Sequence, residues 1–177
     1  MTVAAKRGAL AGAVALIALA IGLSVWWTHP SLPEEQGGNS FSAGPRPVVA
    51  AHLTVPVTWS PIAGRPEVVD VSGARAHFMD NSAAATVTFW ICQNHDGGLI
   101  SAHDLHGACR HLRPLTKNSN VIWAPGVRGE FVVMTLQPRR PGHVRVDRVD
   151  LDFGYRYGPL HRSGTAHITM DVGLRAT

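Results

Sequence analysis

Much of this chain alternates between apolar and other residues with a period of two, and this constrains the fold more than any other feature. Successive side chains of a β-strand point to opposite faces, so the period predicts strands with one buried face. Alternation of this kind covers 53–59, 86–91, 144–157 and 165–172. Residues 130–137 (EFVVMTLQ) instead form a continuous apolar run, as expected of a strand buried on both faces.

The remaining apolar runs after Trp27 are also short, and none keeps a helical period. Adding 68–71, 74–79 and 121–123 gives about seven to nine strands, separated by turns that contain Pro, Gly, Asn or Asp. This spacing predicts an all-β domain, and specifically an immunoglobulin-like β-sandwich. The likeness is one of architecture only, because the cysteine–tryptophan–cysteine spacing of a true immunoglobulin domain is absent.

Two local features refine the prediction for individual strands. Pro56 lies inside an alternating run and cannot donate a backbone hydrogen bond, so it predicts an edge strand. Within 144–157 the apolar residues move from even to odd positions near Asp147 and Arg148. One extra residue in a strand shifts the alternation in this way, so we predict a β-bulge there.

The N-terminal part of the chain predicts one transmembrane helix. Residues 8–27 contain no charged residue, and a helix of about 20 residues spans about 30 Å, the thickness of a bilayer core. Residues 1–7 are short and basic, which places this end in the cytoplasm. A cleaved signal peptide and a buried core helix are the alternatives; a cleaved signal usually has a shorter apolar region that ends in a small-x-small site.

The segment after this helix predicts a linker and then one domain. Residues 28–47 are rich in Pro and Gly and have no apolar period, which is typical of a flexible linker. Residues 48–177 then form a single domain of about 130 residues, large enough to be stable alone. With the N-terminus in the cytoplasm, this domain is expected outside it, on a single-pass protein of the cell membrane. The net charge of +4 is too small to indicate nucleic-acid binding.

The chain has two cysteines, Cys92 and Cys109. An even number of cysteines in an exported domain predicts a disulfide bond. In the chain-entropy model a bond that closes a loop of this size contributes about 3 kcal/mol to stability. Two buried free thiols and two metal-bound thiolates are the alternatives.

Four histidines around these cysteines form the strongest chemical pattern in the sequence. Histidine is the commonest metal ligand in proteins, so a zinc or copper site is one interpretation. The spacing matches no defined metal site, and solvated loop histidines are the simpler interpretation. The four residues are His95, His103, His106 and His111.

A basic stretch around residues 138–142 is the second candidate site. Its members are Arg139, Arg140 and His143, together with Arg145 and Arg148. The stretch could contact anionic lipid headgroups or cell-wall polymers. The alternative is a solvated turn whose charges discourage pairing between sheet edges.

Three acidic residues follow this turn, and their spacing does not fit a calcium-binding loop. We expect neighbouring arginines on the same strand face to neutralise Asp150 and Asp152 within the sheet. The acidic residues are Asp147, Asp150 and Asp152, and the arginines are Arg148 and Arg156.

The sequence of residues 129–158, with the two cysteines upstream, resembles a group of uncharacterised envelope proteins from high-GC Gram-positive (actinobacterial) bacteria. The resemblance covers about residues 84–158 and rests on two spaced cysteines and a strand–Arg-Pro-Gly–strand hairpin that ends in an aromatic strand. It implies a membrane-anchored β-sandwich and supplies no catalytic residues.

Motifs of common enzyme classes are missing from the sequence. It contains no G-x-S-x-G, H-E-x-x-H, phosphate-binding P-loop or G-x-G-x-x-G pattern. We therefore predict a non-enzymatic envelope module without a cofactor, which binds or positions a membrane or cell-wall partner. An extracytoplasmic metal-binding protein that uses the loop histidines is the alternative.

Overall fold

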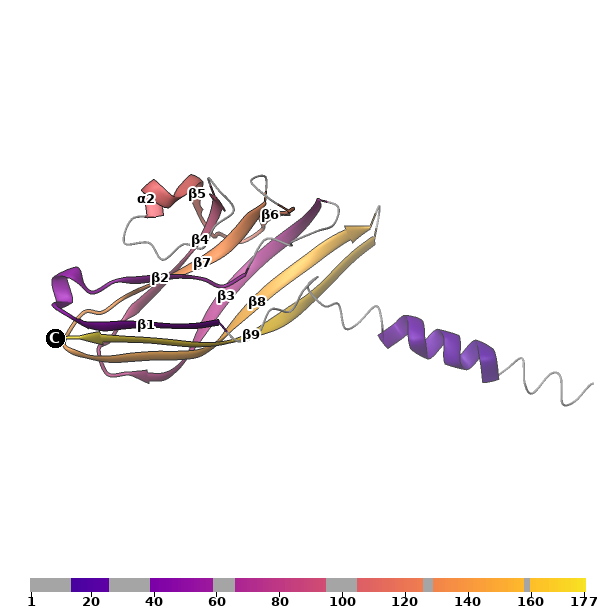
Figure 1. Cartoon of the computed structure of the whole chain (residues 1–177). Helices are drawn as coiled ribbons and strands as arrows, with labels where there is room; N and C mark the ends of the chain where they lie inside the picture. Colours follow the sequence, from indigo (N-terminus) through magenta and orange to yellow (C-terminus); the bar gives the residue numbers. More distant parts are fainter. Residues whose placement is uncertain (1–13, 26–38, 59–65, 95–104, 126–128, 158–159) are drawn as a thin grey trace, which may run out of the picture.

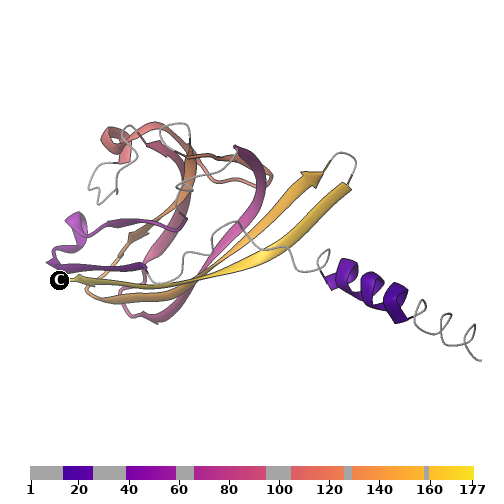
Figure 2. The same cartoon turned by 45° about the vertical axis from the view of Figure 1, so that its right-hand side comes forward.

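The computed structural model describes residues 14–25, 39–58, 66–94, 105–125, 129–157 and 160–177. Within these residues the domain consists of two β-sheets that face each other (Figures 1 and 2). The five-stranded sheet has the order β1-β9-β8-β3-β6, and the four-stranded sheet has the order β2-β7-β4-β5. The elements are β1 (Asn39–Arg46), η1 (Val48–Ala50), β2 (Leu53–Pro56), β3 (Glu67–Asn81), β4 (Thr86–Asn94), α2 (Leu105–Ala108), β5 (Cys109–Pro114), β6 (Ser119–Trp123), β7 (Glu130–Gln137), β8 (Gly142–Tyr157) and β9 (Leu160–Ala176).

This architecture confirms an all-β, sandwich-like fold. Inward-facing side chains of both sheets form one core that includes Val71, Ile91, Met134 and Leu151. Strand β7 is buried on both faces, as its continuous apolar run predicts. Pro56 lies in β2 at the edge of the four-stranded sheet, also as predicted.

The long strands β3, β8 and β9 dominate the five-stranded sheet, as Figure 2 shows, and β8 runs antiparallel to both β3 and β9. The prediction of two separate strands at 68–71 and 74–79 is wrong, because both segments belong to β3. The register of β3 against β8 shifts between Val71 and Gly73. This irregularity changes the phase of the alternation without ending the strand.

The predicted irregularity in β8 is confirmed. The register of β8 against β9 shifts between Val146 and Arg148. Val146 and Val149 are both fully buried although they are three residues apart, while Asp147 between them is exposed. The strand therefore keeps apolar side chains in the core on both sides of the shift.

The predicted boundary between linker and domain is wrong. Residues 39–46, which the composition assigns to the linker, form β1 and pair in parallel with β9. Phe41 and Ala43 pack against the core. Strand β1 lies at the edge of the sheet and offers only these two apolar side chains to the core. The alternation in its sequence is therefore too short to predict a strand.

A helix covers residues 14–25 of the predicted 8–27 span, and the rest of that span lies outside the described residues. In the part of the chain that the structure describes, no helix has the length and apolar character needed to cross a membrane.

Candidate functional site

A disulfide bond joins the end of β4 to the start of β5 and confirms the prediction for the cysteines. Cys92 and Cys109 are bonded, and their Cα atoms lie 5.4 Å apart. Both are buried in a small apolar cluster with Phe131 and Val133 of β7. Neither sulfur is therefore a free thiol or a thiolate ligand for a metal ion.

The four candidate metal-ligating histidines are not brought together within the described residues. His95 and His103 lie outside these residues, and His106 is described only by its backbone, in α2. His111 is exposed on β5. No group of three or more His, Cys, Asp or Glu residues suited to a metal ion occurs in the described ranges, and the metal site remains a prediction.

The basic turn is held rigidly against the turn between β3 and β4. The backbone N–H groups of Arg139 and Arg140 donate to the carbonyl of Ala83 at 3.1 and 3.2 Å. Arg140 Nε donates to the carbonyl of Ser82 at 2.8 Å. The Ser82 hydroxyl accepts from the N–H of His143 at 2.9 Å. These bonds fix the direction in which β8 leaves the turn, and Arg140 contributes to the fold itself.

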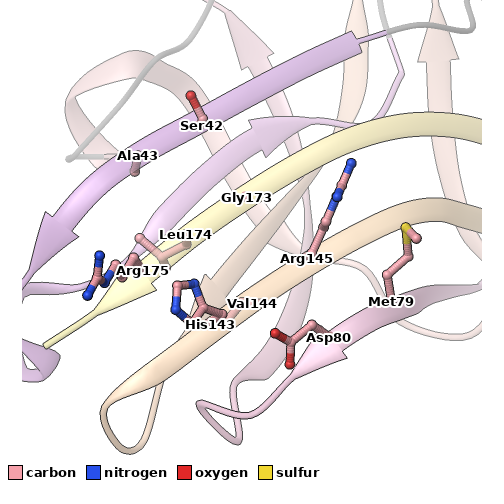
Figure 3. Close-up of a pocket in the computed structure, with 10 residues that line it drawn as sticks. All are labelled: Ser42, Ala43, Met79, Asp80, His143, Val144, Arg145, Gly173, Leu174 and Arg175. Atoms are coloured by element: carbon pink, nitrogen blue, oxygen red, sulfur yellow. The ribbon is translucent and has the colours of Figure 1, made fainter.

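Next to this turn, the outer face of the five-stranded sheet has a hollow at Gly173 (Figure 3). Ser42 pairs with Gly173, Gly173 with Arg145, and Arg145 with Asp80, so these residues form one row across four strands. A Cβ atom built on Gly173 would meet no atom within 4 Å. The hollow that includes this open position has a volume of about 450 Å³.

We name this feature the basic hollow, and it is lined by Ser42, Asp80, His143, Arg145, Gly173 and Arg175 among others. Arg145 Nε lies 3.1 Å from Asp171 Oδ1 in an exposed ion pair. Within the described residues no carboxylate pairs with Arg175. Both guanidinium groups and the His143 imidazole are exposed. Of the basic stretch predicted from the sequence, His143 and Arg145 line the hollow, whereas Arg139 and Arg140 lie on the adjoining turn.

A second polar cluster on the same face was not predicted from the sequence. Asp150 of β8 accepts hydrogen bonds from His77 Nε2 of β3 and His167 Nδ1 of β9, both at 2.6 Å. Arg148 Nε lies 3.1 Å from Asp150 Oδ1. The expected neutralisation of Asp150 by Arg148 is therefore found, but two histidines from neighbouring strands complete it. The side chain of Arg156 lies outside the described part of the structure.

These contacts determine the protonation of Asp150. Burial raises its pKa, but hydrogen bonds from His167 and His77, together with the positive charge on His77 and Arg148, outweigh burial and lower it below its ordinary value. A lowered pKa in the folded state means that the unfolded chain binds the proton more readily. The contribution of Asp150 to stability is then present above the unfolded pKa and is lost as the pH falls through the folded value.

Asp150→Asn should lower the free energy of unfolding at pH 7 by about 1–3 kcal/mol, because the half-buried charged acceptor of two histidine hydrogen bonds is lost. As the pH falls below about 4, Asp150 of the unfolded chain takes up a proton before the folded-state residue does, so the difference should shrink. Urea unfolding of the full chain across pH 3–7 measures both effects. Asp171→Asn, in the exposed pair with Arg145, is the matched control and should change stability by less than about 0.5 kcal/mol. A difference for Asp150→Asn that does not vary with pH would contradict this account.

No protein-family model matches this sequence, and no curated protein is significantly similar to it. The resemblance to envelope proteins therefore remains a prediction, and the functional argument rests on the molecule itself.

Proposed function

We propose that this protein is a non-enzymatic, membrane-anchored module whose β-sandwich binds an anionic group of a membrane or cell-wall partner in the basic hollow. The observation that carries the proposal is the placement of Arg145, Arg175 and His143 around the space left at Gly173. Exposed cationic side chains around a preformed depression suit a ligand that bears phosphate or carboxylate groups.

The chemistry of arginine supports this choice of ligand. A guanidinium group presents a planar fork of donors that matches the oxygens of phosphate or carboxylate. Arg145 and Arg175 extend from adjacent strands, β8 and β9, which are about 4.8 Å apart. Ser42 on β1 adds a hydroxyl on the other side of the hollow. Several donors can therefore reach one anionic group from different sides.

The membrane anchor and its orientation belong to the same proposal. The apolar side chains of the helix over 14–25 are exposed, with Val14, Leu16 and Leu19 at 61%, 69% and 60%. A helix that is apolar on all sides is normally buried in protein or in lipid. The basic residues at 1–7 favour a cytoplasmic N-terminus, and the sandwich, which we take as immunoglobulin-like in architecture, would then face the outside of the membrane.

Binding of a fluorescently labelled inorganic polyphosphate to the full chain in neutral detergent micelles tests the function. Arg175→Gln combined with His143→Gln should weaken binding about 10-fold or more, since a hydrogen bond to a charged group contributes about 1.5–3 kcal/mol. Arg110→Gln, an exposed arginine on β5 of the other sheet, is the control and should leave the affinity unchanged. Equal weakening by the control, or no binding by the wild type, would refute the proposal.

A further inference from the structure

We propose that a second hollow on the same sheet face is a binding site for the neutral, hydroxyl-rich ring of a saccharide. It lies at the opposite end of β8 from the basic hollow and has a volume of about 370 Å³. We name it the polar hollow, and its lining includes Asp70, Asn118, Asn120, Gly154, His161 and Ser163. The proposal is independent of anion binding, because no residue is shared between the two hollows.

The polar hollow, like the basic hollow, lies over a row of paired residues that contains a glycine. Asn120 pairs with Asp70, Asp70 with Gly154, and Gly154 with Ser163, which forms one row across β6, β3, β8 and β9. Gly154 contributes no side chain to this row. Asp70 and Ser163 are two strands apart, about 10 Å, and the imidazole of His161 lies over Gly154 between them.

His161 forms a wall of the polar hollow because it lies over Gly154. A Cβ atom built on Gly154 would be 2.6 Å from His161 Nε2 and 3.1 Å from the carbonyl oxygen of Arg162. With glycine at position 154 the imidazole can take this position without moving. The imidazole lies between Asp70 and Ser163 and lines the hollow, where its ring nitrogens can bond to a ligand.

The lining of the polar hollow favours hydroxyl groups over anions. A carboxylate accepts hydrogen bonds, an amide both donates and accepts, and a serine hydroxyl does either. Asp70, Asn120 and Ser163 therefore offer the mixture that vicinal hydroxyls need. No Arg or Lys is among the described residues that line the hollow, so no guanidinium or ammonium group of the lining offsets the Asp70 carboxylate, in contrast to Asp80 beside Arg145 in the basic hollow.

Two exposed apolar side chains lie next to the polar hollow, and this surface, which we name the apolar shelf, restricts the class of ligand further. Val68 and Ile122 pair across β3 and β6 and are 56% and 43% exposed. Each is two residues along its strand from Asp70 or Asn120, so all four side chains share the outer face. A sugar ring has hydroxyls at its rim and C–H groups on its faces, and it can contact the polar row and the shelf together.

Isothermal titration of the full chain with maltotriose, cellotriose and the N-acetylglucosamine trimer tests the proposal. The detergent must lack a sugar headgroup, because a glycoside would compete. At least one trisaccharide should bind with Kd below about 10 mM, and Asn120→Ala should weaken that binding about 10-fold through lost hydrogen bonds. Asn120 is exposed, so its replacement leaves the core intact.

Reciprocal variants separate the two sites. Arg175→Gln should not change saccharide binding, and Asn120→Ala should not change polyphosphate binding. A soluble polymer of the sugar that binds distinguishes the two sources of the ligand when it is titrated at the same molar concentration of sugar chains as the trisaccharide. Tighter binding by the polymer indicates a wall glycan, and equal affinity indicates a free saccharide. Failure of all three trisaccharides to bind, or equal affinity in Asn120→Ala, would overturn the proposal.

Discussion

Replacing Cys92 and Cys109 by alanine should lower the free energy of unfolding by about 3 kcal/mol. The bond joins residues separated by 17 positions, and without it the unfolded chain regains the conformational entropy of that loop. The measurement is urea unfolding of the full chain, followed by tryptophan fluorescence. Wild-type protein treated with reductant is the control and should lose the same amount. A loss below about 1 kcal/mol in both samples would show that the loop is constrained by other contacts.

Gly142→Ala should lower the free energy of unfolding by about 2–4 kcal/mol. Gly142 has φ of +150°, and an added Cβ atom would lie 2.8 Å from the Ala83 nitrogen and 2.9 Å from the Ser82 carbonyl carbon. Both are backbone atoms that cannot rotate away, so the two interlocked turns would have to separate.

The control for this substitution is Gly44→Ala. A Cβ atom built on Gly44 meets no atom within 4 Å, so the change should alter stability by less than about 0.5 kcal/mol. Thermal or urea unfolding of both variants gives the comparison. If the two variants lose stability equally, steric contact between the turns does not explain the requirement for glycine.

The strands that could be predicted from the sequence are those with a long apolar alternation. The shift of phase near Asp147 in β8 was visible because apolar residues lie on both sides of it. Strand β1 was missed because it offers only Phe41 and Ala43 to the core. The continuity of β3 was missed because the phase changes at Gly73, which resembles a turn in the sequence.

The candidate sites depend on strand register, which local sequence does not determine. His77 pairs with Arg148, and Asp150 pairs with His167, so the Asp150 cluster requires residues that are far apart in the sequence. The two hollows arise where Gly154 and Gly173 occupy outward positions between polar neighbours on adjacent strands. A glycine at an outward position of a long alternating run can be recognised in the sequence as a candidate position for a hollow. The residues that flank it on the adjacent strands become known only when the pairing of the strands is known.

The most direct test of the basic hollow as the binding site is to fill it. Gly173→Leu places a side chain in the hollow, where a Cβ atom meets no other atom within 4 Å, so the fold should be preserved. Thr169→Leu, at an exposed position of β9 outside the lining, is the matched control. We expect Gly173→Leu to weaken polyphosphate binding about 10-fold or more, with an unchanged unfolding midpoint and unchanged binding by Thr169→Leu. Wild-type affinity in a folded Gly173→Leu protein would contradict the assignment of this hollow as the anion site.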